Sequence, residues 1–95
     1  MQARVALVTG GTGGIGSSIL LKLASMGHKV ATNYRDEGKA RAWQTAMKAA
    51  GVDVVMAKGD VSSAESAESM VRDLERQLGP IDILVNNAGI TRDTT

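Results

Sequence analysis

The residues best placed to do chemistry are five glycines that fall within seven positions, at 10–16. They follow an apolar run, Val5 to Val8, and lead directly into a helical pattern. An apolar run bounded by turn residues is typical of a strand buried on both faces, and glycines allow a tight turn and a close approach of a ligand. The next helix would present unpaired N–H groups and the positive end of its dipole. The stretch therefore predicts a site for a dinucleotide pyrophosphate.

Two other interpretations of these glycines stay open. A loop that binds a nucleoside triphosphate has glycines spaced as Gly11 and Gly16 are, but it then needs a lysine where this chain has Ser17. A glycine-rich turn that binds nothing is the second alternative, although five glycines are more than a turn needs and each costs conformational entropy. The dinucleotide interpretation is favoured over both.

Two motifs in combination resemble the short-chain dehydrogenase/reductase family. They are Thr-Gly-x-x-x-Gly-Ile-Gly at residues 9–16 and Asn-Asn-Ala-Gly at residues 86–89, and the resemblance covers essentially the whole chain. The resemblance implies a nicotinamide cofactor held by a Rossmann-type domain. The cofactor-binding positions that it implies in this chain are Gly10, Gly11, Thr12, Gly14, Ile15, Gly16, Tyr34, Arg35, Asp60, Val61, Asn87, Ala88 and Gly89.

Apolar runs alternate with helical patterns along the chain, which predicts βαβ units and an α/β fold with a parallel sheet. Strands are expected at about 4–9, 29–34, 53–57 and 81–85, and helices at about 14–27, 37–50 and 62–78. Right-handed crossovers give the strand order 3-2-1-4 of a doubly wound Rossmann-type sheet, with the first two helices on one face and the third on the other. Residues 1–95 would form the N-terminal part of such a domain, with both motifs at the switch point of the sheet.

Apolar residues recur at helical spacing on each expected helix. The residues expected on these faces are Ile15, Ile19, Leu20 and Leu23, then Ala40, Trp43, Met47 and Ala50, then Ala67, Met70, Val71, Leu74 and Leu78. Ser62 and Glu65 have the spacing of a capping box for the third helix. The one histidine, His28, is expected to be a solvated turn residue, because a lone histidine does not build a metal cluster.

The composition argues against several other classes of function. A net charge of +1 without a basic run disfavours a nucleic-acid partner. The absence of cysteine gives neither a disulfide framework nor a thiolate metal site, so nothing indicates an oxidising compartment. No signal peptide and no apolar run long enough to cross a membrane are found, and the expected location is the cytoplasm.

The end of the second expected strand decides between NAD and NADP in this fold. An acidic residue there accepts hydrogen bonds from the ribose hydroxyls, whereas a basic residue pairs with a 2′-phosphate. In the register of the family the usual acidic position falls at Tyr34, and Arg35 follows with a guanidinium, so NADPH is favoured. Asp36 lies twenty residues after Gly16 and is the alternative ribose acceptor.

Two other polar positions gain roles from the resemblance. In the family an aspartate at the position of Asp60 hydrogen-bonds the adenine, and the backbone of the next residue, Val61, flanks the ring. The alternative is that Asp60 only starts the turn into the third helix. Asn86 and Asn87 are expected to bridge neighbouring strands and the glycine loop through their side-chain amides.

The proton donor that a ketone reduction needs is not found in this chain. The family uses a serine, a tyrosine and a lysine four residues after that tyrosine, all beyond Asn-Asn-Ala-Gly. Here the one tyrosine, Tyr34, is followed four residues later by Gly38, so no catalytic residue is assigned. The chain is therefore expected to be the cofactor-binding part of a longer NADPH-dependent reductase. A complete, non-catalytic dinucleotide-binding module is the alternative.

Within the family, residues 33–35 and 86–93 look most like the acetoacetyl-CoA and 3-oxoacyl-[acyl-carrier-protein] reductases. This resemblance implies a 3-oxoacyl thioester as the small-molecule substrate and a homotetramer for the full-length enzyme. By the same resemblance, the glycine loop favours the CoA-using branch of these reductases, which supplies polyhydroxyalkanoate synthesis. A short-chain dehydrogenase of another substrate class stays open as an alternative.

Overall fold

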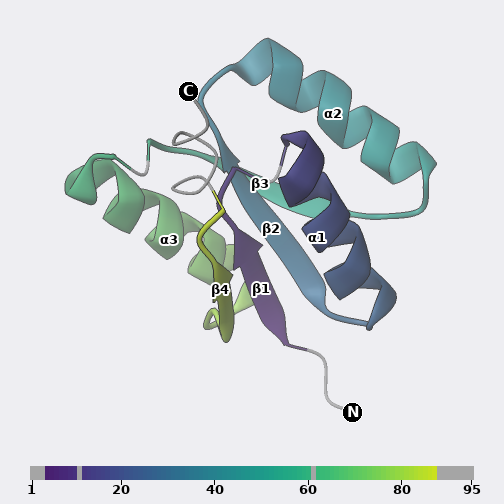
Figure 1. Ribbon diagram of the computed structural model, residues 1–95. Helices are drawn as coiled ribbons and strands as arrows, with labels where there is room; N and C mark the ends of the chain where they lie inside the picture. The colour runs from purple at the N-terminus through teal and green to yellow at the C-terminus, as the bar shows by residue number, and fades with distance from the viewer. Residues whose placement is uncertain (1–3, 11, 61, 88–95) are drawn as a thin grey trace.

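A computed structural model of the chain describes residues 4–10, 12–60 and 62–87. Strands and helices alternate along these residues, as expected (Figure 1). The strands are β1 (Val5–Val8), β2 (Lys29–Tyr34), β3 (Val54–Lys58) and β4 (Ile83–Val85), and the helices are α1 (Gly14–Ser25), α2 (Glu37–Ala49) and α3 (Ala64–Leu78). The predicted elements are all present and differ from the observed ones only at their ends. None of the helices in the described ranges is both long and apolar enough to cross a membrane.

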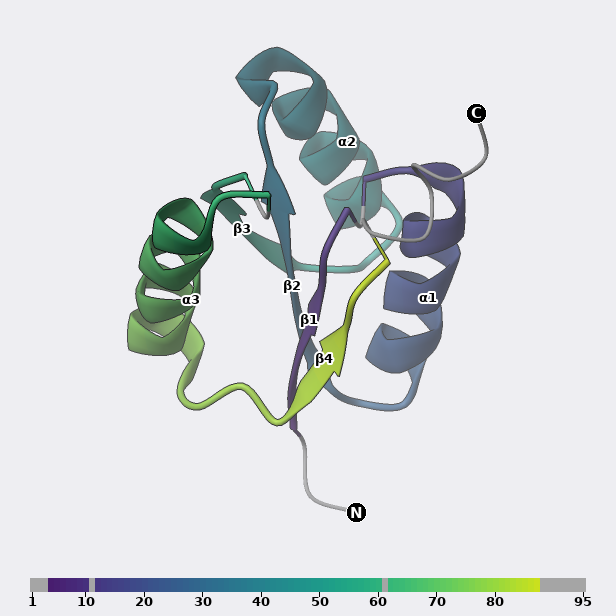
Figure 2. The same cartoon turned by 60° about the vertical axis from the view of Figure 1, so that its left-hand side comes forward.

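The four strands form one parallel sheet in the order β3-β2-β1-β4, which confirms the predicted topology. In the register of the sheet, Leu7 of β1 lies between Ala31 of β2 and Leu84 of β4. The strand order reverses between β1 and β4, so the loops that follow these two strands meet at the switch point. Figure 2 shows the sheet nearly edge-on, with α3 on one side and α1 and α2 on the other.

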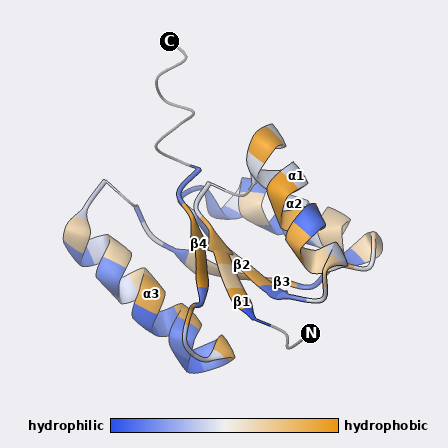
Figure 3. Cartoon of the chain, turned by 60° about the horizontal axis from the view of Figure 1, so that its bottom comes forward, coloured by the Kyte–Doolittle hydropathy of each residue, from blue (hydrophilic) through white to orange (hydrophobic). Residues whose placement is uncertain are grey.

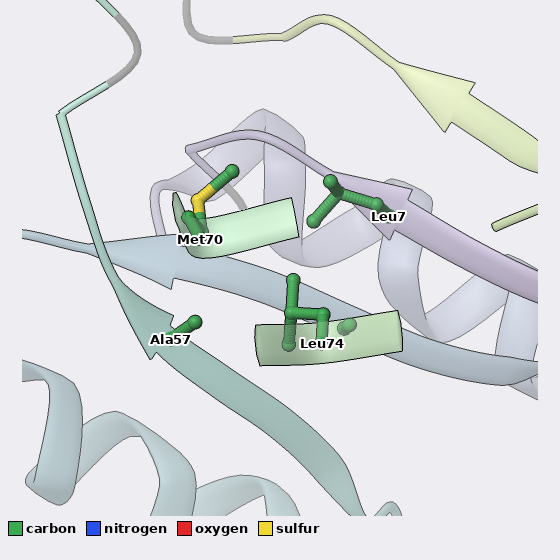
Figure 4. Packing of buried hydrophobic residues seen from close by; sticks show 5 residues of the cluster. Leu7, Ala57, Met70 and Leu74 are labelled. Atoms are coloured by element: carbon green, nitrogen blue, oxygen red, sulfur yellow. The ribbon is translucent and has the colours of Figure 1, made fainter. Parts of the chain in front are cut away.

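Each face of the sheet has its own hydrophobic core, because successive residues of a strand point to opposite faces. Leu7 points to the face of α3, where it packs with Ala31, Ala57, Met70 and Leu74. Figure 4 shows four of these side chains meeting between β1, β3 and α3. Val8 points to the other face, where its cluster contains Leu20, Val30, Met47 and Val54. The predicted placement of the three helices is therefore confirmed.

Helix α3 is amphipathic and sits close to the sheet. Its buried residues are Met70 and Leu74, as expected, while its outward side is hydrophilic (Figure 3). The close approach depends on Gly59, which follows β3. A Cβ atom at Gly59 would lie 2.9 Å from the Cβ of Met70, which is closer than carbon atoms approach without a shift.

The predicted capping box at the start of α3 is wrong. The helix begins at Ala64, and its N-cap is Ser63, whose hydroxyl accepts a hydrogen bond from the backbone N–H of Ser66. The backbone N–H of Ser62 instead donates to the Asp60 carboxylate at 2.9 Å. The Ser-x-x-Glu spacing singles out Ser62, but Ser63 takes the cap, and the bond to Asp60 places Ser62 in the preceding turn.

His28 is not the solvated turn residue that the sequence predicts. It is buried, and its Nδ1 accepts a hydrogen bond from the backbone N–H of Arg4 at 3.2 Å. This bond fixes the segment before β1 against the start of β2, because Lys29 also donates its backbone N–H to the Arg4 carbonyl at 2.9 Å. A histidine that joins two strands in this way stabilises the sheet.

Two residues expected on the apolar faces of the helices are exposed because they lie at helix ends. Ile15 is 62% exposed in the first turn of α1, whereas Ile19, Leu20 and Leu23 in the later turns contact the core. Ala50 is the C-cap of α2 and is exposed as well. The other members of the predicted faces are buried or partly buried.

Candidate functional site

The loop between β1 and α1 turns sharply at the carboxyl edge of the sheet. Gly10 adopts φ 66°, a left-handed conformation that favours glycine, and its carbonyl accepts a hydrogen bond from Gly13 N–H at 3.3 Å. Helix α1 then begins at Gly14 without a side-chain cap and without an acidic residue in its first turn. The positive end of the α1 dipole is therefore not offset by any side chain of the first turn.

Gly14 is not required by the packing of the chain itself. No described residue outside α1 comes within 4 Å of a Cβ placed at this position, and Gly14 does not have a positive φ. The neighbouring glycine of the motif, Gly16, is buried in the helix. A glycine that neither the backbone conformation nor the packing demands leaves space beside the helix start for a ligand.

The two asparagines after β4 reach back to the glycine loop, as expected. Asn86 Oδ1 accepts a hydrogen bond from the Thr9 hydroxyl at 3.2 Å, and Asn87 Nδ2 donates to the Gly10 carbonyl at 3.2 Å. Asn87 is 1% exposed. Its Oδ1 is the one buried side-chain oxygen or nitrogen within the described ranges that has no hydrogen-bond partner. A buried amide oxygen of this kind is ready to accept a further donor.

Asn33, at the end of β2, is a site residue that the sequence analysis missed. Its Oδ1 accepts a hydrogen bond from Gly10 N–H at 2.9 Å, and its Nδ2 donates to the Gly59 carbonyl at 3.0 Å. One buried amide thus contacts both the β1–α1 loop and the loop after β3. The available signal was an asparagine in a strand that is otherwise closely packed, because a buried amide needs partners for its donors and acceptors.

The ends of β2 and β3 carry a pair of opposite charges. The Arg35 guanidinium lies 3.8 Å from Asp60 Oδ2, and both side chains are substantially exposed. Asp60 Oδ1 accepts hydrogen bonds from the hydroxyl and the backbone N–H of Ser62, at 2.7 and 2.9 Å. The hydroxyl of Ser62 first, then its N–H and the Arg35 charge, lower the pKa of Asp60 below its ordinary value. Asp60 therefore does start the turn into α3.

Asp36 is engaged elsewhere. It is the N-cap of α2, and its Oδ1 accepts a hydrogen bond from the backbone N–H of Lys39 at 3.1 Å. Tyr34, one position before Arg35, is partly buried at the end of β2. Arg35 therefore carries the exposed charge at the end of β2, while the Asp36 carboxylate stabilises a helix.

Four of the predicted site residues, Gly11, Val61, Ala88 and Gly89, lie outside the described residues. The others gather along the carboxyl edge of the sheet, at the end of β2, in the loops after β1, β2, β3 and β4 and in the first turn of α1. The described residues contain no group of three histidine, aspartate or glutamate side chains that could hold a metal ion.

The family of this chain follows from a comparison with known proteins. A family model described as short chain dehydrogenase matches residues 4–95. The chain belongs to this family. An acetoacetyl-CoA reductase of Allochromatium vinosum is 52% identical to this chain over 99% of the chain and 39% of its own length. A 3-oxoacyl-[acyl-carrier-protein] reductase FabG of Staphylococcus aureus is 47% identical over 97% of the chain and 38% of its own length.

Solved structures give the same result for the fold. An actinorhodin polyketide ketoreductase crystallised with NADPH matches 90% of this chain with a TM-score of 0.83 and 38% identity, over 33% of its own length. A metagenomic short-chain oxidoreductase in complex with NADP matches 88% of the chain with a TM-score of 0.76 and 36% identity, over 38% of its own length. The chain thus spans less than two fifths of the length of each of these relatives and solved structures.

Proposed function

We propose that this chain binds NADPH as the cofactor-binding part of a reductase that converts a 3-oxoacyl thioester of the acetoacetyl-CoA type into the 3-hydroxyacyl thioester. The observation that carries the proposal is the start of α1. It has no side-chain cap and no acidic residue in its first turn, and no described residue outside α1 lies within 4 Å of a Cβ placed on Gly14. A pyrophosphate placed there would accept hydrogen bonds from backbone N–H groups and meet the positive end of the helix dipole.

The residues of the chain fit the rest of the cofactor in two places. Arg35 would pair with the 2′-phosphate, because a guanidinium binds phosphate oxygens through several N–H donors and Asp36 is occupied as a helix cap. Asp60 would hydrogen-bond the adenine, the backbone of Val61 would flank the ring, and Tyr34 would line the ribose side. Towards the nicotinamide, Asn87 offers a buried oxygen without a partner, next to Ala88 and Gly89 of the same motif.

When bound, NADPH supplies the hydride for the reduction. The part of this chain in the reaction is to bind and orient that cofactor. Gly10, Gly11 and Thr12 would shape the turn around the pyrophosphate, and Gly14, Ile15 and Gly16 would present the helix start. No proton donor is assigned, because the one tyrosine of the chain, Tyr34, has its place on the adenosine side.

The substrate class rests on the relatives. The acetoacetyl-CoA reductase and the 3-oxoacyl-[acyl-carrier-protein] reductase are 52% and 47% identical to the chain. A homotetramer, a cytoplasmic location and a role in polyhydroxyalkanoate or fatty acid metabolism belong to the same proposal. Consumption of NADPH on addition of acetoacetyl-CoA, by a polypeptide that contains this chain, tests the substrate; no consumption with any 3-oxoacyl thioester contradicts it.

The cofactor is tested by titrating the purified protein with NADPH and with NADH. We expect NADPH to bind more tightly, and we expect Arg35→Gln to lower the preference for NADPH about ten-fold, or ~1.4 kcal/mol, by weakening NADPH alone. Arg76→Gln is the matched control, because it removes the same charge from the last turn of α3. Equal affinity of the unmodified protein for NADPH and NADH, or an equal loss of NADPH affinity in Arg35→Gln and Arg76→Gln, contradicts the role of Arg35.

A further inference from the structure

The amide of Asn33 joins two loops that come from different strands. Because β2 lies between β1 and β3 in the sheet, a side chain at its carboxyl end reaches the loops that follow both neighbours. The Oδ1 atom binds Gly10 N–H at 2.9 Å and the Nδ2 atom binds the Gly59 carbonyl at 3.0 Å, and the residue is only 7% exposed. The two loops are therefore tied together inside the protein and away from competing water.

We infer that Asn33 is a positioning residue for the cofactor, which holds the loop at the pyrophosphate and the loop at the adenosine at a fixed spacing. The inference rests on the proposed function and adds a role to a residue that would not touch the cofactor. A ligand that spans two loops binds tightly only if the loops are ordered before it arrives, because otherwise part of the binding free energy is spent on ordering them.

The chemistry of the two partners explains why an asparagine suits this position. Gly10 and Gly59 have no side chains, so only their backbone groups are available to fix them. One offers a donor and the other an acceptor. An asparagine supplies an acceptor and a donor on one short, planar group, whereas an ionised aspartate lacks the donor and an aliphatic residue lacks both.

The loop after β3 is already held to β2 by a backbone hydrogen bond. Gly59 N–H donates to the Tyr34 carbonyl at 3.0 Å. The bond from Asn33 Nδ2 is thus not needed to keep β3 in the sheet. Its distinct effect is to connect that loop, through one amide, to the turn at Gly10.

The test compares two ligands in two variants. Asn33→Asp keeps an acceptor for Gly10 N–H but replaces the donor to the Gly59 carbonyl by a repelling oxygen. Gln44→Ala is the matched control, because it removes another amide bond to a backbone carbonyl, from Gln44 Nε2 to Val54 O at 2.9 Å, at the opposite end of β3. NADPH would contact both loops, whereas 2′-AMP would contact only the adenosine side.

We expect Asn33→Asp to weaken NADPH about ten-fold and 2′-AMP less than about three-fold, with both ligands unaffected by Gln44→Ala. Equal losses for the two ligands in Asn33→Asp, or an unchanged affinity for NADPH, would overturn the inference and leave Asn33 with a purely structural role. Failure of the unmodified protein to bind NADPH is a different result, which overturns the proposed function itself.

A second measurement uses the unmodified protein and so does not depend on the folding of the variant. In an amide-resolved NMR titration, 2′-AMP should shift the amide resonance of Gly10, because the Gly10 N–H donates its hydrogen bond to Asn33 Oδ1. Inorganic pyrophosphate should in turn shift the resonance of Asp60, which follows the Gly59 carbonyl. Shifts that stay confined to the loop that binds each ligand would overturn the coupling.

Discussion

The loops that follow β1 and β3 both bring a glycine to the helix that comes next, but for different reasons. At the β3 loop, Gly59 is required by packing, because a Cβ would lie 2.9 Å from Met70, and α3 is capped by Ser63. At the β1 loop, no described residue outside α1 comes within 4 Å of a Cβ placed on Gly14, and α1 has no side-chain cap. Gly59 thus serves the packing of the fold, whereas Gly14 improves no contact among the described residues. The difference supports the proposal that the loop after β1 holds a ligand.

The start of α2 resembles that of α3, because both have a side-chain cap and an acidic residue in the first turn. Asp36 caps α2 through the backbone N–H of Lys39, and Glu37 lies in its first turn, as Glu65 lies in the first turn of α3. Both helices therefore satisfy part of their own N-terminal N–H groups and offset their dipoles. Helix α1 has neither a side-chain cap nor an acidic residue in its first turn, which supports the proposal that an anion binds there.

The largest effect is expected from Gly14→Asp, which gives α1 the acidic first turn that the other helices have. The carboxylate would repel the pyrophosphate and fill its space, and we expect the affinity for NADPH to fall about 100-fold, or ~2.7 kcal/mol. Stability should stay the same or rise by up to ~1 kcal/mol, because an acid at a helix N-terminus is favourable. Trp43, the one tryptophan, reports binding by fluorescence, because its Nε1 lies 2.9 Å from Ser17 Oγ in α1.

Ala64→Asp is the matched control, because Ala64 is the first residue of α3 as Gly14 is of α1. It should leave the affinity for NADPH unchanged. An equal loss of affinity in the two variants would mean that charge alone, and not the site at α1, explains the effect.

The next effect concerns stability and separates the two glycines. Gly59→Ala should lower the free energy of unfolding by about 1–3 kcal/mol, because the added carbon overlaps Met70. Gly14→Ala should instead raise it by up to ~1 kcal/mol, because alanine is the better helix former. Thermal or urea unfolding measures both. Similar changes in the two variants would remove the distinction between the loops.

The cap of α3 gives a smaller effect. Ser63→Ala should cost ~1 kcal/mol of stability, because it removes the acceptor for Ser66 N–H at the helix start. Ser62→Ala should cost less, since Ser62 lies before the cap and bonds the exposed Asp60. Unfolding curves of the two variants decide between the observed cap and the capping box that the sequence suggested; a larger loss in Ser62→Ala would favour the capping box.

The smallest effect is a change in titration. Hydrogen bonds from Ser62 and the charge of Arg35 lower the pKa of Asp60. The ionised carboxylate therefore stabilises the folded state at pH values above its ordinary pKa. This stabilisation is lost as the pH falls through the lowered pKa. Ser62→Ala should therefore raise the pKa of Asp60 towards its ordinary value. An NMR titration of the carboxyl group measures it, and an unchanged pKa would contradict the assigned cause.

The sheet was predictable from the sequence because its signal is local. Each strand is a short apolar run, each helix shows its own periodicity, and the right-handedness of the crossovers restricts the possible arrangements of four strands sharply. The glycine loop was predictable for the same reason, since its residues are neighbours in the chain.

Other roles depend on residues that meet only in the folded chain. Asn33 binds Gly10, 23 positions away, and Gly59, 26 positions away, and His28 binds Arg4, 24 positions away. No periodicity marks such partners. The spacing of Ser62 and Glu65 was misleading, because a capping signal in the sequence does not show which of two adjacent serines begins the helix.

The most direct test of the proposed pyrophosphate site is an amide-resolved NMR titration of the unmodified protein with NADPH. Saturable shifts are expected to be largest at the start of α1, at Gly13, Gly14 and Ile15, with small shifts at the capped first turns of α2 and α3. Saturable binding without shifts at the start of α1, or no binding at all, would contradict the claim that this helix start is built for the pyrophosphate of the cofactor.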